Sequence, residues 1–204
     1  MSFDDQVILY GALLLAVILH EVSHGVVALA FGDDTAKRAG RLTLNPVPHI
    51  DPVGSVLLPA MAVLAGLPVL GWAKPVPVNP ARLRDPRRHM LLVGLAGPFT
   101  NFTLMMAAAF GARVFLDGPS ELAFTILWSF ALVNLFLGVF NMLPIPPLDG
   151  SSLIERLLPT RHLASWHRFR PYGFVVIFAG LFFFDLFGTI IDPFADALVR
   201  FVVN

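Results

Sequence analysis

Two histidines and a glutamate lie close together in an otherwise apolar stretch near the N-terminus. In VILHEVSHGV (17–26), His20, Glu21 and His24 have the spacing H-E-x-x-H. Residues four apart on a helix share one face, so both imidazoles can bind the same zinc ion. Zinc lowers the pKa of a bound water to about 7, and a neighbouring carboxylate can then act as a general base. The motif therefore predicts that His20 and His24 bind one Zn2+ and that Glu21 is the catalytic acid/base.

A catalytic zinc site needs a third protein ligand and an open position for water. Asp149 is the best candidate, because the prolines of FNMLPIPPLDGSSL (140–153) interrupt helical structure immediately before it. Backbone of that kind is tolerated at membrane depth only where it is buried in protein or lines a watery cavity. The remaining histidines lie in loops or among basic residues, where structural or interfacial roles are more common: His49, His89, His162 and His167. Of these, His49 in NPVPHIDPVG is the hardest to dismiss as a ligand.

The composition is that of a membrane protein. Of 204 residues, 56% are hydrophobic and only 14% charged, whereas about 25% charged residues is usual in soluble domains. Apolar segments of about the 20 residues that cross a bilayer lie at 6–31, 53–72, 90–112, 121–140 and 172–191. We expect an all-α polytopic bundle of four to six membrane segments, forming a single domain over residues 1–204. The absence of cysteine excludes thiolate ligands, and no nucleic-acid partner is expected.

The segment at 53–72 differs from the others because glycines and prolines interrupt it. It is flanked by GRLTLNP (40–46) and KPVPVNP (74–80). In both stretches residue types alternate with a period of two, as is typical of strands. If these two pair, they lie on one side of the membrane, and 53–72 must be re-entrant. The positive-inside rule agrees, since the loops of 33–90 hold eight cations: Lys37, Arg38, Arg41, Lys74, Arg82, Arg84, Arg87 and Arg88. We therefore expect a small cytoplasmic-side, membrane-associated β-sheet and an extracytoplasmic N-terminus, with a kinked span at 53–72 as the alternative.

The expected depths of the two parts of the site agree. With Asp5 at the outer surface, His20 lies about 15 residues along a helix, or about 22 Å into the bilayer. Starting outside near Glu121, the fourth segment reaches Asn141 after about 30 Å. The histidines and the proline-broken segment can therefore meet close to the cytoplasmic face.

Three separated strings resemble the site-2 protease family of intramembrane zinc metalloproteases. They are HEVSH in an early span, GLAGPFTNF (94–102) in a central one and NMLPIPPLDG (141–150) at the end of the next. GRLTLNPVPHIDPVG and GWAKPVPVNP resemble the small bacterial and archaeal branch, and the similarity runs to about Leu158. Unlike larger relatives, the sequence shows no inserted PDZ domain and no ligand-sensing domain.

The resemblance implies specific roles for residues of this chain. His20, His24 and Asp149 would bind zinc, Glu21 would be the acid/base, and the strand-bearing loops would present an extended substrate. Asn101 and Asn141 match asparagines that bind the substrate backbone or stabilise the oxyanion; the alternative for each is a hydrogen bond to a neighbouring helix. The implied substrates are transmembrane segments of other proteins. A zinc transporter or sensor, or an inactive scaffold that binds helices, are the competing functions.

Overall fold

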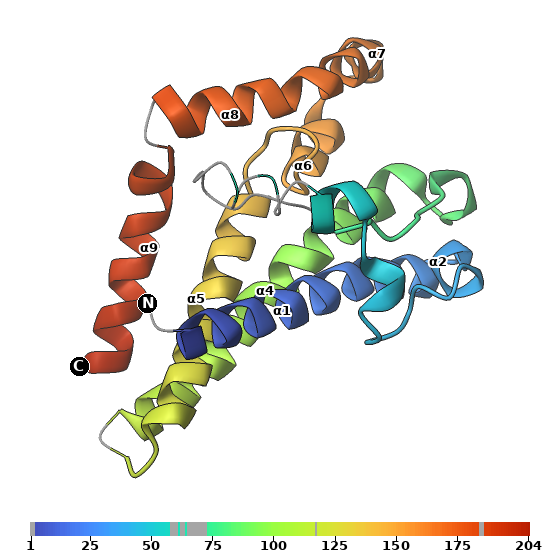
Figure 1. Ribbon diagram of the computed structural model, residues 1–204. Coiled ribbons are helices and arrows are strands. Elements are labelled where there is room, and N and C mark those ends of the chain that lie inside the picture. Colours follow the sequence, from blue (N-terminus) through green and yellow to red (C-terminus); the bar gives the residue numbers. More distant parts are fainter. Residues whose placement is uncertain (1–2, 58–60, 62–63, 65–72, 117, 184–185) are drawn as a thin grey trace.

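Three long helices form the centre of the protein. The computed structural model describes the chain except for residues 1–2, 58–60, 62–63, 65–72, 117 and 184–185. Helices α1 (Phe3–Ala30), α4 (Pro86–Phe115) and α5 (Glu121–Asn141) all pack against one another (Figure 1). In the described part of the chain, these three are long and apolar enough to cross a membrane. The chain is therefore a multi-pass membrane protein, and the predicted helices at 6–31, 90–112 and 121–140 are present.

Local sequence signals explain where these helices begin and end. The Asp85 side chain accepts a hydrogen bond from the Arg88 N–H, and Pro86 occupies the first position of α4, where no N–H is needed. Ser120 caps α5 in the same way, by accepting from the Ala123 N–H. After α1, Gly32 has a φ of 106°, a conformation that glycine adopts without steric cost. The chain reverses at these points and brings α4 back along α1.

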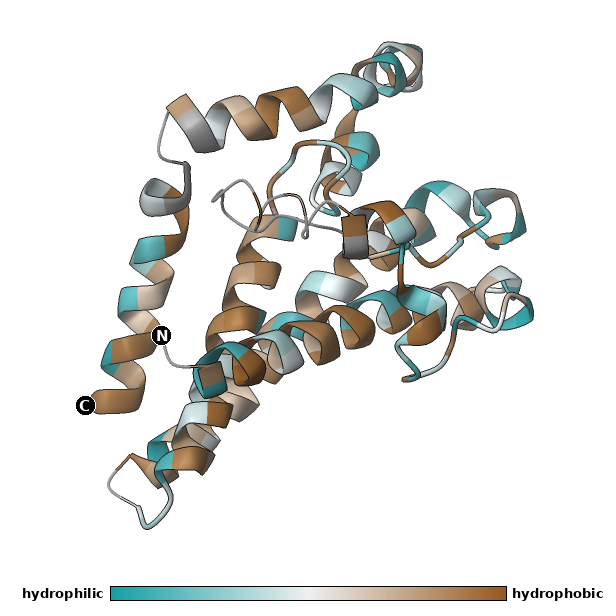
Figure 2. Cartoon of the chain, viewed as in Figure 1, coloured by the Kyte–Doolittle hydropathy of each residue, from teal (hydrophilic) through white to brown (hydrophobic). Residues whose placement is uncertain are grey.

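The largest core cluster lies between α4, α5 and α9 (Leu186–Val203). Small side chains let these helices approach closely, and larger ones from α5 and α9 fill the remaining space: Ala108, Ala109, Ala112, Ala131, Leu135, Val139, Leu198 and Val202. Outside the core, large apolar residues such as Leu14, Phe99 and Val114 are exposed. Figure 2 shows apolar residues along the three long helices and hydrophilic ones gathered toward α2 and α7. The exposed apolar surface is that expected for contact with lipid.

Short helices make up most of the rest. They are α2 (Thr35–Arg38), η1 (Val47–His49), η2 (Pro52–Leu57), η3 (Pro80–Arg82), α6 (Ser151–Leu157), α7 (Thr160–Phe169), η4 (Arg170–Tyr172) and α8 (Gly173–Phe183). The apolar segment predicted at 172–191 is divided between α8 and α9, which run in different directions (Figure 1). With 11 residues, α8 is too short to cross a bilayer.

The predicted β-sheet is absent from the described residues. The stretches 41–46 and 73–79 do lie close together, but Arg41 joins them by donating from Nη2 to the carbonyls of Lys74 and Pro75. Pro75 and Pro77 have no backbone N–H, so this stretch lacks the donors that a strand ladder needs. The predicted re-entrant segment, 53–72, lies mostly outside the described residues.

Candidate metal centre and catalytic base

The three predicted zinc ligands converge in the structure. Nε2 of His20 lies 3.0 Å from Oδ2 of Asp149, Nε2 of His24 lies 3.3 Å from the same oxygen, and the two Nε2 atoms are 3.1 Å apart. Both imidazoles are buried, with His20 6% and His24 8% exposed. Two imidazole nitrogens of helix α1 and a carboxylate oxygen from the segment after α5, about 125 residues away in sequence, therefore lie in one cluster that could hold a metal ion.

The segment 141–150 folds back on the end of α5 to place Asp149. The Gly150 N–H donates to the Asn141 carbonyl oxygen at 2.7 Å, which closes the loop. A Cβ at Gly150 would lie 2.2 Å from the carbonyl oxygen of Met142, so only glycine fits here. The helix break that the prolines predict is present, and the close approach at Gly150 turns that break into a tight loop.

Two glycines of α4, Gly94 and Gly97, allow this helix to pack closely against α1 and the segment that follows Asp149. A Cβ at Gly97 would lie 2.4 Å from Cε1 of His20 and 2.5 Å from Nε2 of His24. A Cβ at Gly94 would lie 2.6 Å from Oγ of Ser152, three residues after Asp149. Gly97 therefore lies directly against both imidazoles.

Hydrogen bonds from α4 fix both imidazole rings. Nδ1 of His24 lies 2.6 Å from the Val93 carbonyl oxygen, which can only accept, so this nitrogen carries the proton. Nδ1 of His20 lies 2.6 Å from Oδ1 of Asn101. Partners of this kind set the ring orientation of histidines that bind metals. In both residues, Nδ1 bonds to α4 and Nε2 faces Asp149.

These residues fit a zinc ion. With the protons on Nδ1, both Nε2 atoms and Oδ2 of Asp149 present lone pairs to one another, and only a cation between them makes that favourable. In a tetrahedron with bonds of about 2.0–2.1 Å, neighbouring ligand atoms are about 3.3 Å apart, close to the spacing observed.

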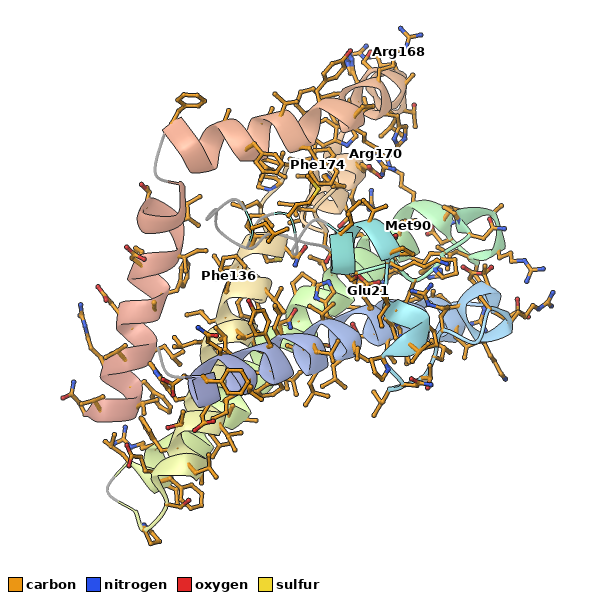
Figure 3. All side chains as sticks on the ribbon, viewed as in Figure 1. Glu21, Met90, Phe136, Arg168, Arg170 and Phe174 are labelled. Carbon is orange, nitrogen blue, oxygen red and sulfur yellow. The ribbon has the colours of Figure 1, made fainter. Side chains whose placement is uncertain are left out.

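Glu21 lies in a different environment from the histidines and is labelled in Figure 3. Its Oε2 accepts a hydrogen bond of 2.8 Å from the Val76 N–H. Val76 stands between two prolines, so its N–H is the single backbone donor of residues 75–77. On one side of this contact Arg41 binds the carbonyls of Lys74 and Pro75. On the other, the Asn79 N–H donates to Asp33 at 2.6 Å. Sequence reasoning missed this contact with the predicted base.

The two predicted substrate-binding asparagines have intramolecular partners. Asn101 is fully buried, and its Nδ2 donates to Oδ1 of Asn134 at 2.8 Å while its Oδ1 contacts His20. These contacts agree with the alternative of a hydrogen bond to a neighbouring helix. Asn141 is half-buried, and its Nδ2 donates to the Leu137 carbonyl at 3.0 Å. Asn134 was not predicted, although a polar residue inside the apolar segment 121–140 was the signal that could have identified it.

His49 lies outside the cluster of His20, His24 and Asp149. It is 2% exposed, its Nε2 contacts the Thr43 carbonyl oxygen at 3.0 Å, and its own carbonyl accepts from the Lys74 N–H at 2.9 Å. These contacts fasten the 43–49 turn to the 73–79 stretch, which is a structural role.

Comparison with known proteins identifies the family of this chain. The model of peptidase family M50 matches residues 119–184. "Putative zinc metalloprotease YwhC" of Bacillus subtilis (strain 168) is 39% identical over 194 residues, covering 91% of this chain and 84% of the relative. "Putative zinc metalloprotease Rip2" of Mycolicibacterium smegmatis is 30% identical over 165 residues, covering 80% of this chain and 62% of the relative. "Zinc metalloprotease MJ0392" of Methanocaldococcus jannaschii is 25% identical over 158 residues, covering 76% and 35%. No solved structure matches. The chain belongs to peptidase family M50, the site-2 proteases.

Proposed function

We propose that this protein is an intramembrane zinc metalloprotease that hydrolyses a peptide bond within or near a transmembrane segment of other membrane proteins. One observation carries the proposal: Asp149 meets His20 and His24, which lie on either side of Glu21 in sequence on α1, a helix long enough to cross a membrane. The family membership supports it, since the relatives above are named zinc metalloproteases. One zinc ion per chain is bound by the three converging residues.

In the proposed reaction, three residues bind zinc and Glu21 transfers protons. A zinc ion held by His20, His24 and Asp149 supplies Lewis-acid polarisation of the scissile carbonyl and makes water more acidic. Glu21 takes the proton of the attacking water and later gives a proton to the leaving amine. Its Oε2 is held by Val76, which leaves the other carboxylate oxygen to exchange the proton. The Nδ1 hydrogen bonds of both histidines keep their Nε2 lone pairs directed at the site.

The substrate must arrive as an extended chain, because a helix uses its carbonyls in internal hydrogen bonds. The loops of 33–90 are suited to presenting it, since the stretch 73–79, which has no regular secondary structure, contacts Glu21 through the Val76 N–H. Asn141, half-buried at the end of α5, is the proposed contact for the substrate backbone. By the positive-inside rule, the cations of 33–90 support an orientation with this end of the bundle, and so the active site, near the cytoplasmic face and with the N-terminus outside.

The test compares wild type with Glu21→Gln in proteoliposomes that contain a panel of single-span membrane proteins. Both proteins should bind one zinc per chain, measured by elemental analysis, and only wild type should cleave, because glutamine cannot accept the proton. Glu121→Gln, at the far end of α5, is the matched control and should cleave like wild type.

Three results would contradict the proposal. Zinc-loaded wild type that cleaves no member of the panel would favour a scaffold. Zinc flux into the vesicles that survives Glu21→Gln would favour a transporter. Equal cleavage by wild type and Glu21→Gln would remove the acid/base role.

A second experiment would identify the natural targets: substrates cross-linked to Glu21→Gln in cells and co-purified with it.

A further inference from the structure

Two fully buried asparagines connect His20 to the backbone of α5. Nδ1 of His20 lies 2.6 Å from Oδ1 of Asn101, and Nδ2 of Asn101 lies 2.8 Å from Oδ1 of Asn134. Nδ2 of Asn134 then donates to the Phe130 carbonyl oxygen at 2.8 Å. Both asparagines are 0% exposed. The series of contacts therefore crosses from α1 through α4 to α5 without reaching solvent.

The last member of this series decides the orientation of all the others. A backbone carbonyl can only accept, so Asn134 must turn its amino group to Phe130 and its oxygen to Asn101. Asn101 must then donate its amino group to Asn134 and turn its own oxygen to His20. That oxygen also can only accept, so Nδ1 of His20 must carry the proton. Nε2 of His20 is left with a lone pair directed at Asp149, 3.0 Å away.

His24 reaches the same state by a shorter route, because its Nδ1 contacts the Val93 carbonyl oxygen directly. His20 has an amide as its partner, and an amide can turn over and offer a donor instead. A turned Asn101 would favour the other tautomer of His20, with the proton on Nε2, where it blocks metal binding. Something must therefore hold Asn101 in one orientation, and Asn134 is the residue in contact with its other end.

We propose that Asn134 is a positioning residue for the metal centre: by accepting from Asn101, it fixes the amide that sets the tautomer and ring orientation of the zinc ligand His20. The inference rests on the zinc site of the proposed function, but not on peptide hydrolysis. It also gives Asn101 a role in orienting the ligand rather than in binding substrate. Partners beyond the direct ligands typically change metal affinity by about 10–100-fold.

The test measures zinc affinity of the full-length protein in detergent by competition with a chelator. Asn134→Ser is the informative variant, because a serine hydroxyl can bond to the carbonyl four residues earlier but is too short to reach Asn101. Zinc affinity should fall about 10–100-fold. Asn134→Asp should restore most of it, since a protonated aspartate donates to Phe130 and still accepts from Asn101. The visible spectrum of the cobalt-substituted protein should change in Asn134→Ser and return in Asn134→Asp.

Thr125→Val is the matched control, because it also removes a side-chain hydrogen bond to the carbonyl four residues earlier in α5, far from the site. It should bind zinc like wild type. If Asn134→Ser lowered thermal stability but bound zinc as tightly as wild type, with an unchanged cobalt spectrum, the role would be structural and the inference wrong. Failure to cleave by a wild type that binds zinc normally would contradict the proposed function alone.

Discussion

His20 and Glu21 are neighbours in sequence, yet the two sides of the site that they form are built differently. On the metal side, His20 and His24 are buried among helices, with Gly97, Val93 and Asn101 of α4 against them. On the base side, Glu21 accepts a hydrogen bond from one N–H of the loop stretch 73–79. Helix packing thus fixes the two histidines, whereas a loop segment holds Glu21.

This difference implies that metal binding and catalysis can be separated. The two histidines are held by contacts between α1 and α4. A substitution at these contacts should therefore lower zinc affinity and cleavage together. The base side depends on two anchors outside the three long helices, Arg41 and Asp33. A change there should lower cleavage while zinc stays bound. Each prediction below tests one side of this comparison.

The largest effect is expected from Gly97→Ala. The new methyl would lie 2.4–2.6 Å from atoms of His20 and His24, and neither ring can move away without losing its Nδ1 partner. Misplacing a reacting group by about 1 Å can cost about 100-fold in rate, and we expect at least that loss of cleavage together with loss of zinc. Elemental analysis and a cleavage assay measure both. Gly11→Ala in α1, where a Cβ meets nothing within 4 Å, is the control; normal zinc content in Gly97→Ala would contradict the close packing.

A smaller effect, confined to the base side, is expected from Val76→Pro. Proline keeps an apolar side chain but removes the N–H that binds Glu21. A hydrogen bond to a charged group contributes about 1.5–3 kcal/mol, so cleavage should fall about tenfold or more while zinc content stays normal. Val76→Ala keeps the N–H and loses only side-chain volume, so the difference between the two variants isolates the hydrogen bond. Equal rates for both would show that Val76 does not position Glu21.

The same comparison shows what the sequence could predict. The candidate roles of His20, Glu21 and His24 are predicted by their spacing on a helix. Asp149 is predicted as a ligand because prolines break the helix before it at the membrane depth of the histidines. The long helices follow from composition and caps. All of these signals are local, or depend on the thickness of the membrane.

What could not be predicted depends on tertiary contacts of backbone and small residues. The Val93 carbonyl, the Val76 N–H and the missing Cβ of Gly97 have no distinctive side chain, so only the packing of helices reveals them. The sheet prediction was wrong for a different reason. The alternation in KPVPVNP predicts a strand, but the prolines of this stretch lack the N–H donors that a strand ladder needs.

The smallest effect is expected from the far anchor of the base side, Asp33. This buried carboxylate accepts from the backbone and hydroxyl of Thr35 and from the Asn79 N–H. Burial raises the pKa of Asp33, but these hydrogen bonds and the nearby Arg82 lower it below its ordinary value of 3.8. A folded pKa below the unfolded one means that ionised Asp33 stabilises the fold above about pH 3.8 and that this stabilisation disappears as the pH falls through the folded pKa.

Asp33→Asn should therefore lower the unfolding temperature at pH 7 by a few degrees, because the amide oxygen replaces only one of the two accepting carboxylate oxygens and the amino group cannot accept from the Thr35 or Asn79 donors. Wild type should keep this advantage at pH 7 and pH 5 and lose it progressively as the pH falls below about 4, so the difference in unfolding temperature between the two proteins should shrink toward low pH in thermal scans. Zinc content should be unchanged and cleavage at pH 7 reduced less than in Val76→Pro, since the Val76 N–H remains. A difference in unfolding temperature that stays constant with pH would show that the charge of Asp33 does not hold the loop, and would leave Arg41 as the anchor of the base side.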